Sequence, residues 1–243
     1  MALRSTISTP HGKRRYVRRL FATIADRYDF ITRVLSYGQD QRWKRRTIEL
    51  ARLQPTDRVL DLAAGTGDLA FAAASSARRV VALDVTHRML QLARLRASSL
   101  SDDVRRRCHF VTADMCALPL YAGAVDIVTT GYGLRNVPVL ADAIREIHRV
   151  LVPGGRLVSL DFNRPGNPLV RQLYWGYLTV VGSALGLVLH GDADTYRYIP
   201  ESIRNYPGAR AVAQLLRDQG FVDVQALPVL FGFMAIHVAV KPK

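Results

Sequence analysis

Short apolar runs alternate with longer amphipathic segments through the middle of the chain. Runs of five or six residues between polar or small residues predict buried strands, and apolar positions at helical spacing predict helices between them. The strand segments are continuously apolar, so we expect a parallel sheet that is covered on both faces. The strands are predicted at 58–62, 79–84, 109–113, 125–130 and 156–161, and the helices at about 68–76, 86–98 and 139–150.

The flanks of this region have different patterns. Residues 14–53 read as helical, with a break at 36–38 after which Asp40 is placed to cap a second helix. Alternation stops after residue 162, then resumes with a helix at about 209–219 and strands at 222–226 and 233–240. We therefore predict an α/β protein with a doubly wound, mostly parallel seven-stranded sheet. Its parts are an N-terminal helical arm at 1–55 and a main domain at 56–243 that carries an insertion at about 163–207.

One stretch inside the insertion is unusually apolar. Residues 173–189 form a run of 17 residues without a charge. A membrane-spanning helix needs about 20 such residues, and this run also contains three glycines. We interpret it as an apolar helix or helix pair on the protein that is suited to touch a membrane, and not as a span.

The net charge of +14 is concentrated in the arm, where residues 1–58 hold 14 basic and 5 acidic side chains. Such an excess attracts an anionic surface, either phospholipid or nucleic acid. A bias in composition toward arginine is the alternative. Composition as a whole excludes a disordered chain, because hydrophobic residues make up 49%.

The cysteines and the N-terminus bear on location. Cys108 and Cys116 are too few for a disulfide scaffold and wrongly spaced for zinc, so we expect a reducing compartment and no metal. No apolar signal segment precedes the basic run at 13–15. These features favour a cytoplasmic protein.

The first strand-to-helix turn is rich in small residues. Asp61 is in the strand, and Gly65, Thr66 and Gly67 form the turn that opens the helix. Glycines there allow a ligand to approach the backbone, and the helix start offers free N–H groups. The turn is neither the dinucleotide pattern G-x-G-x-x-G nor a P-loop, and alone it is also compatible with a purely structural turn.

Acidic residues end the next two strands. Asp84 is placed to accept both hydroxyls of a ribose, and Asp114, followed by Met115, to bind an adenine amino group. The alternatives are a helix cap for Asp84, although Thr86 is better placed, and a turn for Asp114. Together the strand ends predict an adenosine ligand. Without a phosphate clamp, S-adenosylmethionine fits better than NAD or ATP.

Longer motifs resemble a known family. From about residue 25 to 237 the chain is similar to the class I S-adenosylmethionine-dependent methyltransferases, and among them to the ubiquinone/menaquinone biosynthesis C-methyltransferases. The matching segments are 28–29, 36–38, 43–44, 59–68, 133–137, 149–155 and 192–198, of which Gly-Leu-Arg-Asn-Val and Trp-Lys are the most specific.

This resemblance implies contacts to the cofactor S-adenosyl-L-methionine. Thr66, Asp84, Asp114 and Met115 would touch it, beside the turn residues named above. The family often has Ser where this chain has Gly131, so a hydroxyl contact is lost there, and it often has Asn in place of Asp114.

The implied reaction is transfer of a methyl group to a ring carbon of a polyprenylated quinol. A ring carbon becomes nucleophilic when an adjacent phenol, of pKa about 10, loses its proton. Arg135 would hold or help generate the phenolate, and Asn136 would orient the ring oxygen. The alternative for Arg135 is an ion pair with Asp142 or a terminus.

The general base and the residues around the ring are less defined. His190 and His237 are candidate proton acceptors. The tyrosines that could pack against the substrate ring, each of which could equally be core, are Tyr28, Tyr132, Tyr196 and Tyr198.

We expect demethylmenaquinol as the substrate. The benzoquinol precursor of ubiquinone, a phytylated quinone, and O- or N-methylation of a small molecule remain open. Nucleic acid is not an expected partner, because residues 129–133 lack the Asn/Asp-Pro-Pro-Tyr/Phe motif of base methylation. We expect peripheral association with an anionic membrane at its inner, cytoplasmic face. The sequence leaves the oligomeric state open, a homo-oligomer included.

Overall fold

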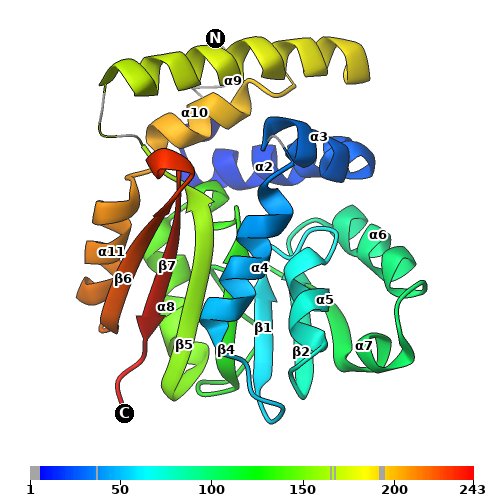
Figure 1. The fold of residues 1–243 in the computed structure, drawn as a ribbon, viewed down its shortest axis with the longest axis vertical. Helices are drawn as coiled ribbons and strands as arrows, with labels where there is room; N and C mark the ends of the chain where they lie inside the picture. Colours follow the sequence, from blue (N-terminus) through cyan, green and yellow to red (C-terminus); the bar gives the residue numbers. More distant parts are fainter. Residues whose placement is uncertain (1–5, 37, 165, 167, 192–194) are drawn as a thin grey trace.

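The computed structural model describes residues 6–36, 38–164, 166, 168–191 and 195–243. Seven strands form one sheet in the order β3-β2-β1-β4-β5-β7-β6 (Figure 1). The five strands β3, β2, β1, β4 and β5 are parallel to one another, and β7 runs antiparallel between β5 and β6. The predicted doubly wound, mostly parallel sheet is confirmed. The strands are β1 Arg58–Leu62, β2 Arg79–Asp84, β3 Cys108–Thr112, β4 Val125–Gly131, β5 Leu151–Phe162, β6 Val222–Val229 and β7 Met234–Val240.

Helices cover both faces of the sheet, as the apolar strands require. One face packs against α4 (Asp40–Ala51), α5 (Asp68–Ala74) and α6 (His87–Ala97) through residues such as Trp43 and Phe71. The other packs against α8 (Leu140–Val150) and α11 (Ala209–Asp218) through residues such as Ile147. These two cores hold β1 and β4 at the centre of the molecule.

The local pattern missed some details. A short helix, α7 (Asp102–Arg107), was not predicted. The expected caps are corrected: the N-cap of α4 is Gln39, and Asp40 is its first residue. Thr86 stands at the N-cap of α6, but its side chain makes no capping hydrogen bond.

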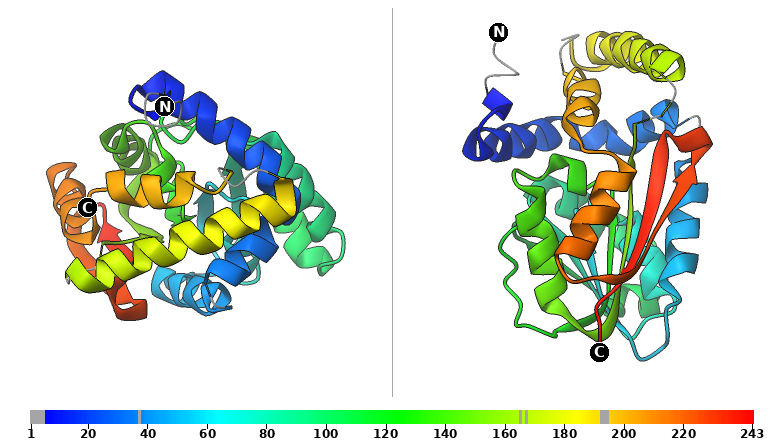
Figure 2. Two further views of the ribbon diagram at one scale, coloured as in Figure 1. Left: turned by 90° about the horizontal axis from the view of Figure 1, so that it is seen from above. Right: turned by 90° about the vertical axis from the view of Figure 1, so that its left-hand side faces the viewer.

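The arm and the insertion lie together over the carboxyl ends of the parallel strands (Figures 1 and 2). The arm contributes α2 (Pro10–Ile24), the short helix η1 (Ala25–Arg27) and α3 (Tyr28–Leu35). The insertion contributes α9 (Pro168–His190) and α10 (Tyr198–Asn205). A third apolar cluster, which includes Leu20, Ile31, Tyr196 and Tyr198, joins the two.

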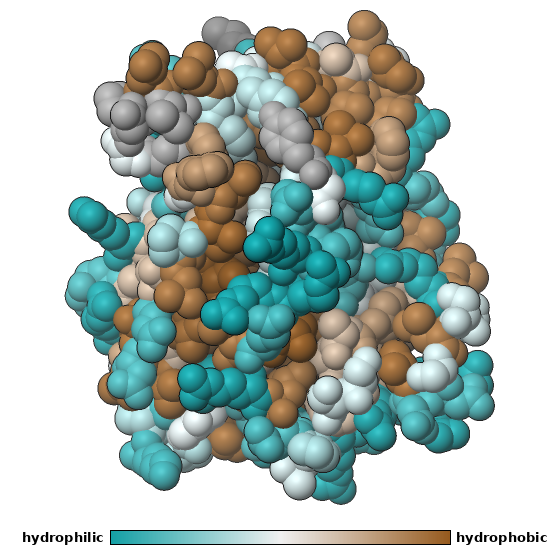
Figure 3. Space-filling model, viewed as in Figure 1, coloured by the Kyte–Doolittle hydropathy of each residue, from teal (hydrophilic) through white to brown (hydrophobic). Residues whose placement is uncertain are grey.

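Helix α9 is one continuous helix across the predicted apolar run. Within the described residues, its segment Arg171–His190 is the one helix long and apolar enough to cross a membrane, by length and composition alone. Only 17% of its most apolar window is buried in the protein. Hydrophobic residues gather along the top of the molecule, over α9 (Figure 3).

Candidate active site

A cleft of about 700 Å³, its open mouth included, lies at the carboxyl ends of the central strands and under α2. Parallel strands present their backbone ends and following loops at one edge, where ligands of such sheets bind. We call it the cofactor cleft. The residues predicted to bind the cofactor that line it are Gly65, Asp84, Asp114, Met115 and Gly131.

Asp84 is held rigidly at the floor of this cleft. It is buried, and its two oxygens accept hydrogen bonds from the backbone N–H groups of Gly65 (2.9 Å) and Thr86 (2.8 Å). Burial raises its pKa. Each carboxylate oxygen retains a further lone pair, so Asp84 can still accept ribose hydroxyls. The alternative role of Asp84 as a helix cap is partly confirmed, because its carboxylate accepts the N–H of Thr86, the residue that precedes α6.

Asp114 has a partner that the sequence did not reveal. Its carboxylate accepts the Cys116 N–H at 2.9 Å and pairs with Nε of Arg14 at 2.8 Å. Arg14 belongs to α2, so the arm reaches across the cleft to the position expected for adenine. The only signal in the sequence was the basic run at 13–15.

A smaller cavity of about 350 Å³ adjoins the cofactor cleft and contains Asp61 in its wall. Asp61 is 1% exposed, and one carboxylate oxygen accepts the Thr129 hydroxyl at 2.8 Å. The other oxygen, Oδ2, has no hydrogen-bond partner among the described residues. Burial raises the pKa of Asp61 to about 7. A buried acceptor without a donor fits the ammonium group of an amino-acid ligand.

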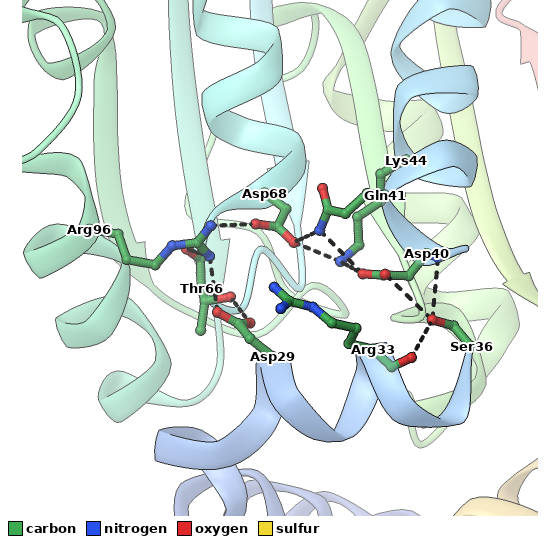
Figure 4. Close-up of polar contacts among 9 residues, drawn as sticks. All are labelled: Asp29, Arg33, Ser36, Asp40, Gln41, Lys44, Thr66, Asp68 and Arg96. Atoms are coloured by element: carbon green, nitrogen blue, oxygen red, sulfur yellow. Dashed lines mark hydrogen bonds and ion pairs between the residues drawn. The ribbon is translucent and has the colours of Figure 1, made fainter. Parts of the chain in front are cut away.

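A polar network closes this cavity from the arm side (Figure 4). Lys44 Nζ lies 2.7 Å from Asp68 and 3.0 Å from Asp40, and Arg96 also pairs with Asp68 at 2.7 Å. Burial alone would raise the pKa of Asp68, but Lys44, Gln41 and Arg96 together outweigh burial and hold the pKa well below its usual value. The network ties α4 and α6 to the start of α5.

Two of the predicted turn residues lie outside the lining of the cofactor cleft. Thr66 lines the small cavity, but its hydroxyl donates to Asp29 of α3 at 2.6 Å. Gly67, with φ +95°, is the N-cap of α5 and lines none of the cavities described here. Both residues therefore shape the turn, and neither presents a side-chain group to the cofactor cleft.

Two glycines at the end of β4 allow close packing. A Cβ at Gly131 would lie 3.1 Å from Cδ1 of Leu69, which is a tight contact. A Cβ at Gly133 would lie 2.6 Å from the Thr130 hydroxyl and 2.8 Å from Ala63. The chain therefore passes tightly against the first turn at this point.

A second large cavity, also about 700 Å³ with its mouth, lies between the arm, the insertion and the sheet. We call it the apolar cavity, because Arg135 is the one charged residue among those that line it. Tyr28 and Tyr132 line both this cavity and the cofactor cleft. All four predicted substrate tyrosines, Tyr28, Tyr132, Tyr196 and Tyr198, line the apolar cavity.

Arg135 is 6% exposed and heavily constrained. Its Nη1 donates to Ser202 at 2.7 Å and to Asn136 at 3.2 Å, and its Nε lies 3.4 Å from Asp161. The alternative pairing with Asp142 is wrong, because Asp142 pairs with Arg145. The buried pair with Asp161 keeps the guanidinium at the wall of the cavity.

Asn136 is next to Arg135 but faces the cofactor cleft. Its Nδ2 donates to the Tyr132 carbonyl at 2.8 Å, and its oxygen accepts from Arg135. It therefore holds Arg135 and the Tyr132 backbone together, and it does not line the apolar cavity.

Neither candidate histidine lines the cavities described here. His237 is buried in β7, where Nε2 bonds the Ala209 carbonyl at 2.9 Å and burial lowers the pKa of the imidazole. His190 bonds the Tyr196 hydroxyl at 2.8 Å. The motif residues Tyr37, Asp192, Ala193 and Asp194 lie outside the described residues.

Comparison with known proteins gives a consistent set of similarities. Residues 9–241 match the ubiE/COQ5 methyltransferase family. A ubiquinone/menaquinone biosynthesis C-methyltransferase of Ectopseudomonas mendocina is 41% identical over 93% of this chain and 89% of that protein. A demethylmenaquinone methyltransferase of Thermus thermophilus is 40% identical over 92% of this chain and 100% of that protein.

Solved structures share the fold. A putative methyltransferase of Bacillus halodurans aligns with a TM-score of 0.61 and 19% identity, over 82% of this chain and 99% of that one. A phosphoethanolamine N-methyltransferase of Haemonchus contortus, bound to S-adenosylhomocysteine, aligns with a TM-score of 0.60 and 15% identity, over 78% and 50%. At these identities the likeness concerns the fold alone.

The raised pKa of Asp61 predicts a pH dependence of stability. Between about pH 4 and pH 7 the folded protein holds a proton on Asp61 that the unfolded chain has released, so the free energy of unfolding falls as pH rises. Asp61→Asn removes this loss. We expect the unfolding free energy of the variant, relative to the wild type, to rise by up to about 4 kcal/mol across this range.

Urea denaturation of the ligand-free protein at a series of pH values measures this difference. Asp126→Asn is the matched control: Arg58 lowers the pKa of Asp126, so this carboxyl titrates below pH 4 and its removal should give a difference that stays constant between pH 4 and pH 7. A difference for Asp61→Asn that does not change with pH would contradict the prediction.

Proposed function

Because the chain belongs to the ubiE/COQ5 methyltransferase family, we propose that it methylates a ring carbon of demethylmenaquinol. The enzyme is an S-adenosylmethionine-dependent methyltransferase of quinone biosynthesis. The observation that carries the choice of substrate class is the apolar cavity, which has a single cation and shares the walls Tyr28 and Tyr132 with the cofactor cleft. A quinol with a prenyl tail is apolar except at its ring oxygens, so it matches this lining.

The residues at the strand ends fit the cofactor. Asp84 would accept the ribose hydroxyls, and Met115 would pack against adenine. Asp114 would receive the adenine amino group once Arg14 moves aside. Asp61 Oδ2 would accept the ammonium group of the amino-acid end. When bound, the cofactor supplies an electrophilic methyl group on a sulfonium.

Arg135 would act on the substrate oxygen. A guanidinium next to a phenol stabilises the phenolate and lowers the pKa of that phenol. Arg135 cannot itself take the proton, because a guanidinium stays charged in proteins. Its role is therefore to hold the anionic oxygen, while Asn136 and Asp161 hold the guanidinium in place.

The tyrosines would exclude water. Tyr196 and Tyr198 are each 1% exposed, and Tyr28 and Tyr132 stand between the cavities. A dry pocket strengthens the attraction between Arg135 and the phenolate and keeps water from the methyl group. The ring then lies against the same wall as the methyl donor, as in-line transfer requires.

We also place the enzyme at the cytoplasmic face of an anionic membrane. A polyprenyl tail leaves the bilayer at a cost of about 0.8 kcal/mol per exposed CH₂, so the enzyme must go to the lipid. Arg15, Arg18 and Arg19 of α2 are exposed on the arm. Bases near a surface contribute attraction of about 1 kcal/mol each.

The substrate is tested by incubating the purified enzyme with labelled S-adenosylmethionine and each prenylated quinol in turn. We expect the labelled methyl group to be transferred to demethylmenaquinol, which gives labelled menaquinol. Transfer restricted to the benzoquinol precursor or to a phytylated quinone would replace this substrate, and transfer only to the oxygen or nitrogen of a small molecule would overturn C-methylation.

Asp84→Ala should weaken cofactor binding by at least tenfold, because a charged acceptor of two hydroxyls is lost. Asp84→Asn, which keeps one acceptor oxygen, should lose less. Asp103→Ala, on exposed α7, should bind normally. Calorimetric titration measures the affinities, and circular dichroism checks the fold. Equal affinity in the wild type and a folded Asp84→Ala would refute the assignment of the ribose site.

Arg135→Ala should lower kcat by about 100-fold or more with little change in cofactor affinity, because its contact strengthens in the transition state. Arg135→Lys keeps the charge without the planar fork and should be intermediate. The control is Arg145→Ala, an exposed arginine on α8. A loss confined to cofactor affinity would make Arg135 part of the cofactor site instead.

The protein should sediment with vesicles that contain anionic lipid and be released by high salt, because salt screens attraction to the arm. Replacing Arg15, Arg18 and Arg19 together by glutamine should weaken binding, and the matched triple change at Arg105, Arg106 and Arg107 should not. Vesicle binding that depends on neither lipid charge nor salt would show that the arginine excess reflects composition bias. Tighter binding to RNA at the same salt would revive the nucleic-acid alternative.

A further inference from the structure

The tip of the β6–β7 hairpin carries an unusually exposed aromatic side chain. Phe231 in the short helix η3 (Leu230–Gly232) is 96% exposed, the highest value among the exposed large apolar residues that the structure describes. Exposed apolar residues also line α9 beside it. We call Phe231 and these residues the apolar rim; the α9 members are Leu169, Leu173, Val180, Leu187 and Val188.

The backbone holds Phe231 outward. Leu230 (φ +48°) and Phe231 (φ +52°) are both left-handed, which is costly for residues with a side chain. The paired strands β6 and β7 enforce the turn. The neighbouring Phe233 packs on Tyr174 of α9 with ring centroids 4.2 Å apart, so the tip and α9 form one surface.

The apolar cavity reaches this same surface. Leu230 at the tip and Tyr174 on α9 both line it. A tail that leaves the cavity between them would emerge next to Phe231 and the first half of α9, at one end of the apolar rim.

Charged and aromatic groups border the rim as they do at a lipid interface. Arg171 and Arg204 lie over the ring of Trp175 at 5.7 and 4.9 Å, while residues 172–189 of α9 carry no charge. Tryptophan and arginine at the edge of an apolar surface suit the head-group level of a bilayer. A second copy of this chain would bring the same charge of +14, whereas anionic lipid complements it.

We propose that the apolar rim inserts into the bilayer, with α9 lying in the membrane plane and Phe231 as a wedge, so that the apolar cavity opens toward the acyl chains. This inference rests on the proposed quinol substrate, and it names the surface through which that substrate would enter from the bilayer. The basic helix α2 lies at the same end of the molecule as α9 (Figure 2). The protein can therefore present α2 to the lipid head groups and insert the apolar rim in a single orientation.

Tryptophan reporters and brominated lipids test the orientation. Phe231→Trp and Val180→Trp should each add fluorescence that is quenched by anionic vesicles with brominated acyl chains, measured as the difference from the wild type with its own Trp43 and Trp175. The matched control is Tyr121→Trp, because Tyr121 is 70% exposed and interacts with Arg58 at the opposite end of β1. Its added fluorescence should be unaffected.

Phe231→Ser should lower vesicle affinity about tenfold, since a buried phenylalanine contributes on that scale. It should leave methylation of a short-tailed quinol in solution unchanged, because Phe231 lines none of the described cavities.

Absence of quinol methylation by the wild-type enzyme would refute the proposed function and not the docking surface. Quenching at 231 no greater than at 121, or an apolar rim protected by dimerisation without lipid, would overturn the insertion. Retention on vesicles until detergent is added would show that α9 spans instead.

Discussion

The ion pair between Lys44 and Asp68 is the contact on which the site depends. Both side chains are nearly buried, at 11% and 13% exposure, and Lys44 also holds Asp40. Removing either partner weakens the network without leaving the other charge unpaired, because Asp68 keeps Arg96 and Lys44 keeps Asp40. Because Lys44 lies on α4 and Asp68 begins α5, the pair fastens the helical arm to the first turn of the sheet.

The two large cavities lie where the arm covers the edge of the sheet. The sheet provides the floor of the cofactor cleft, and α2 provides its cover. Tyr28 of α3 and Tyr132 after β4 then stand as a shared wall. Tyr132 adopts φ +61°, a strained conformation that the close passage of Gly133 past Ala63 supports. The cofactor cleft and the apolar cavity are thus separate spaces that meet at one wall.

Electrostatics and hydrophobicity act at the same end of the molecule. The arm carries most of the excess positive charge, and α9 carries the largest exposed apolar side chains of the insertion. Inside, Asp161 pairs with the charge of Arg135 and Ser202 accepts a hydrogen bond from its Nη1, which makes a buried cation tolerable beside an apolar cavity. Under the proposed function, this arrangement provides a charge for the substrate oxygen and apolar groups for its tail.

The sequence by itself determined the sheet, its order of elements and the edge at which Asp84 and Asp114 lie, because apolar runs and helical periodicity are local properties of the chain. Its motifs also identified the segment that holds Arg135. Only the tertiary structure decided the partners: Arg14 for Asp114, Asp29 for Thr66, and Asp161 rather than Asp142 for Arg135. These pairs join residues 26 to 100 positions apart in the chain. Which side chains meet over such separations depends on how the arm and insertion pack on the sheet, and no local pattern encodes that packing.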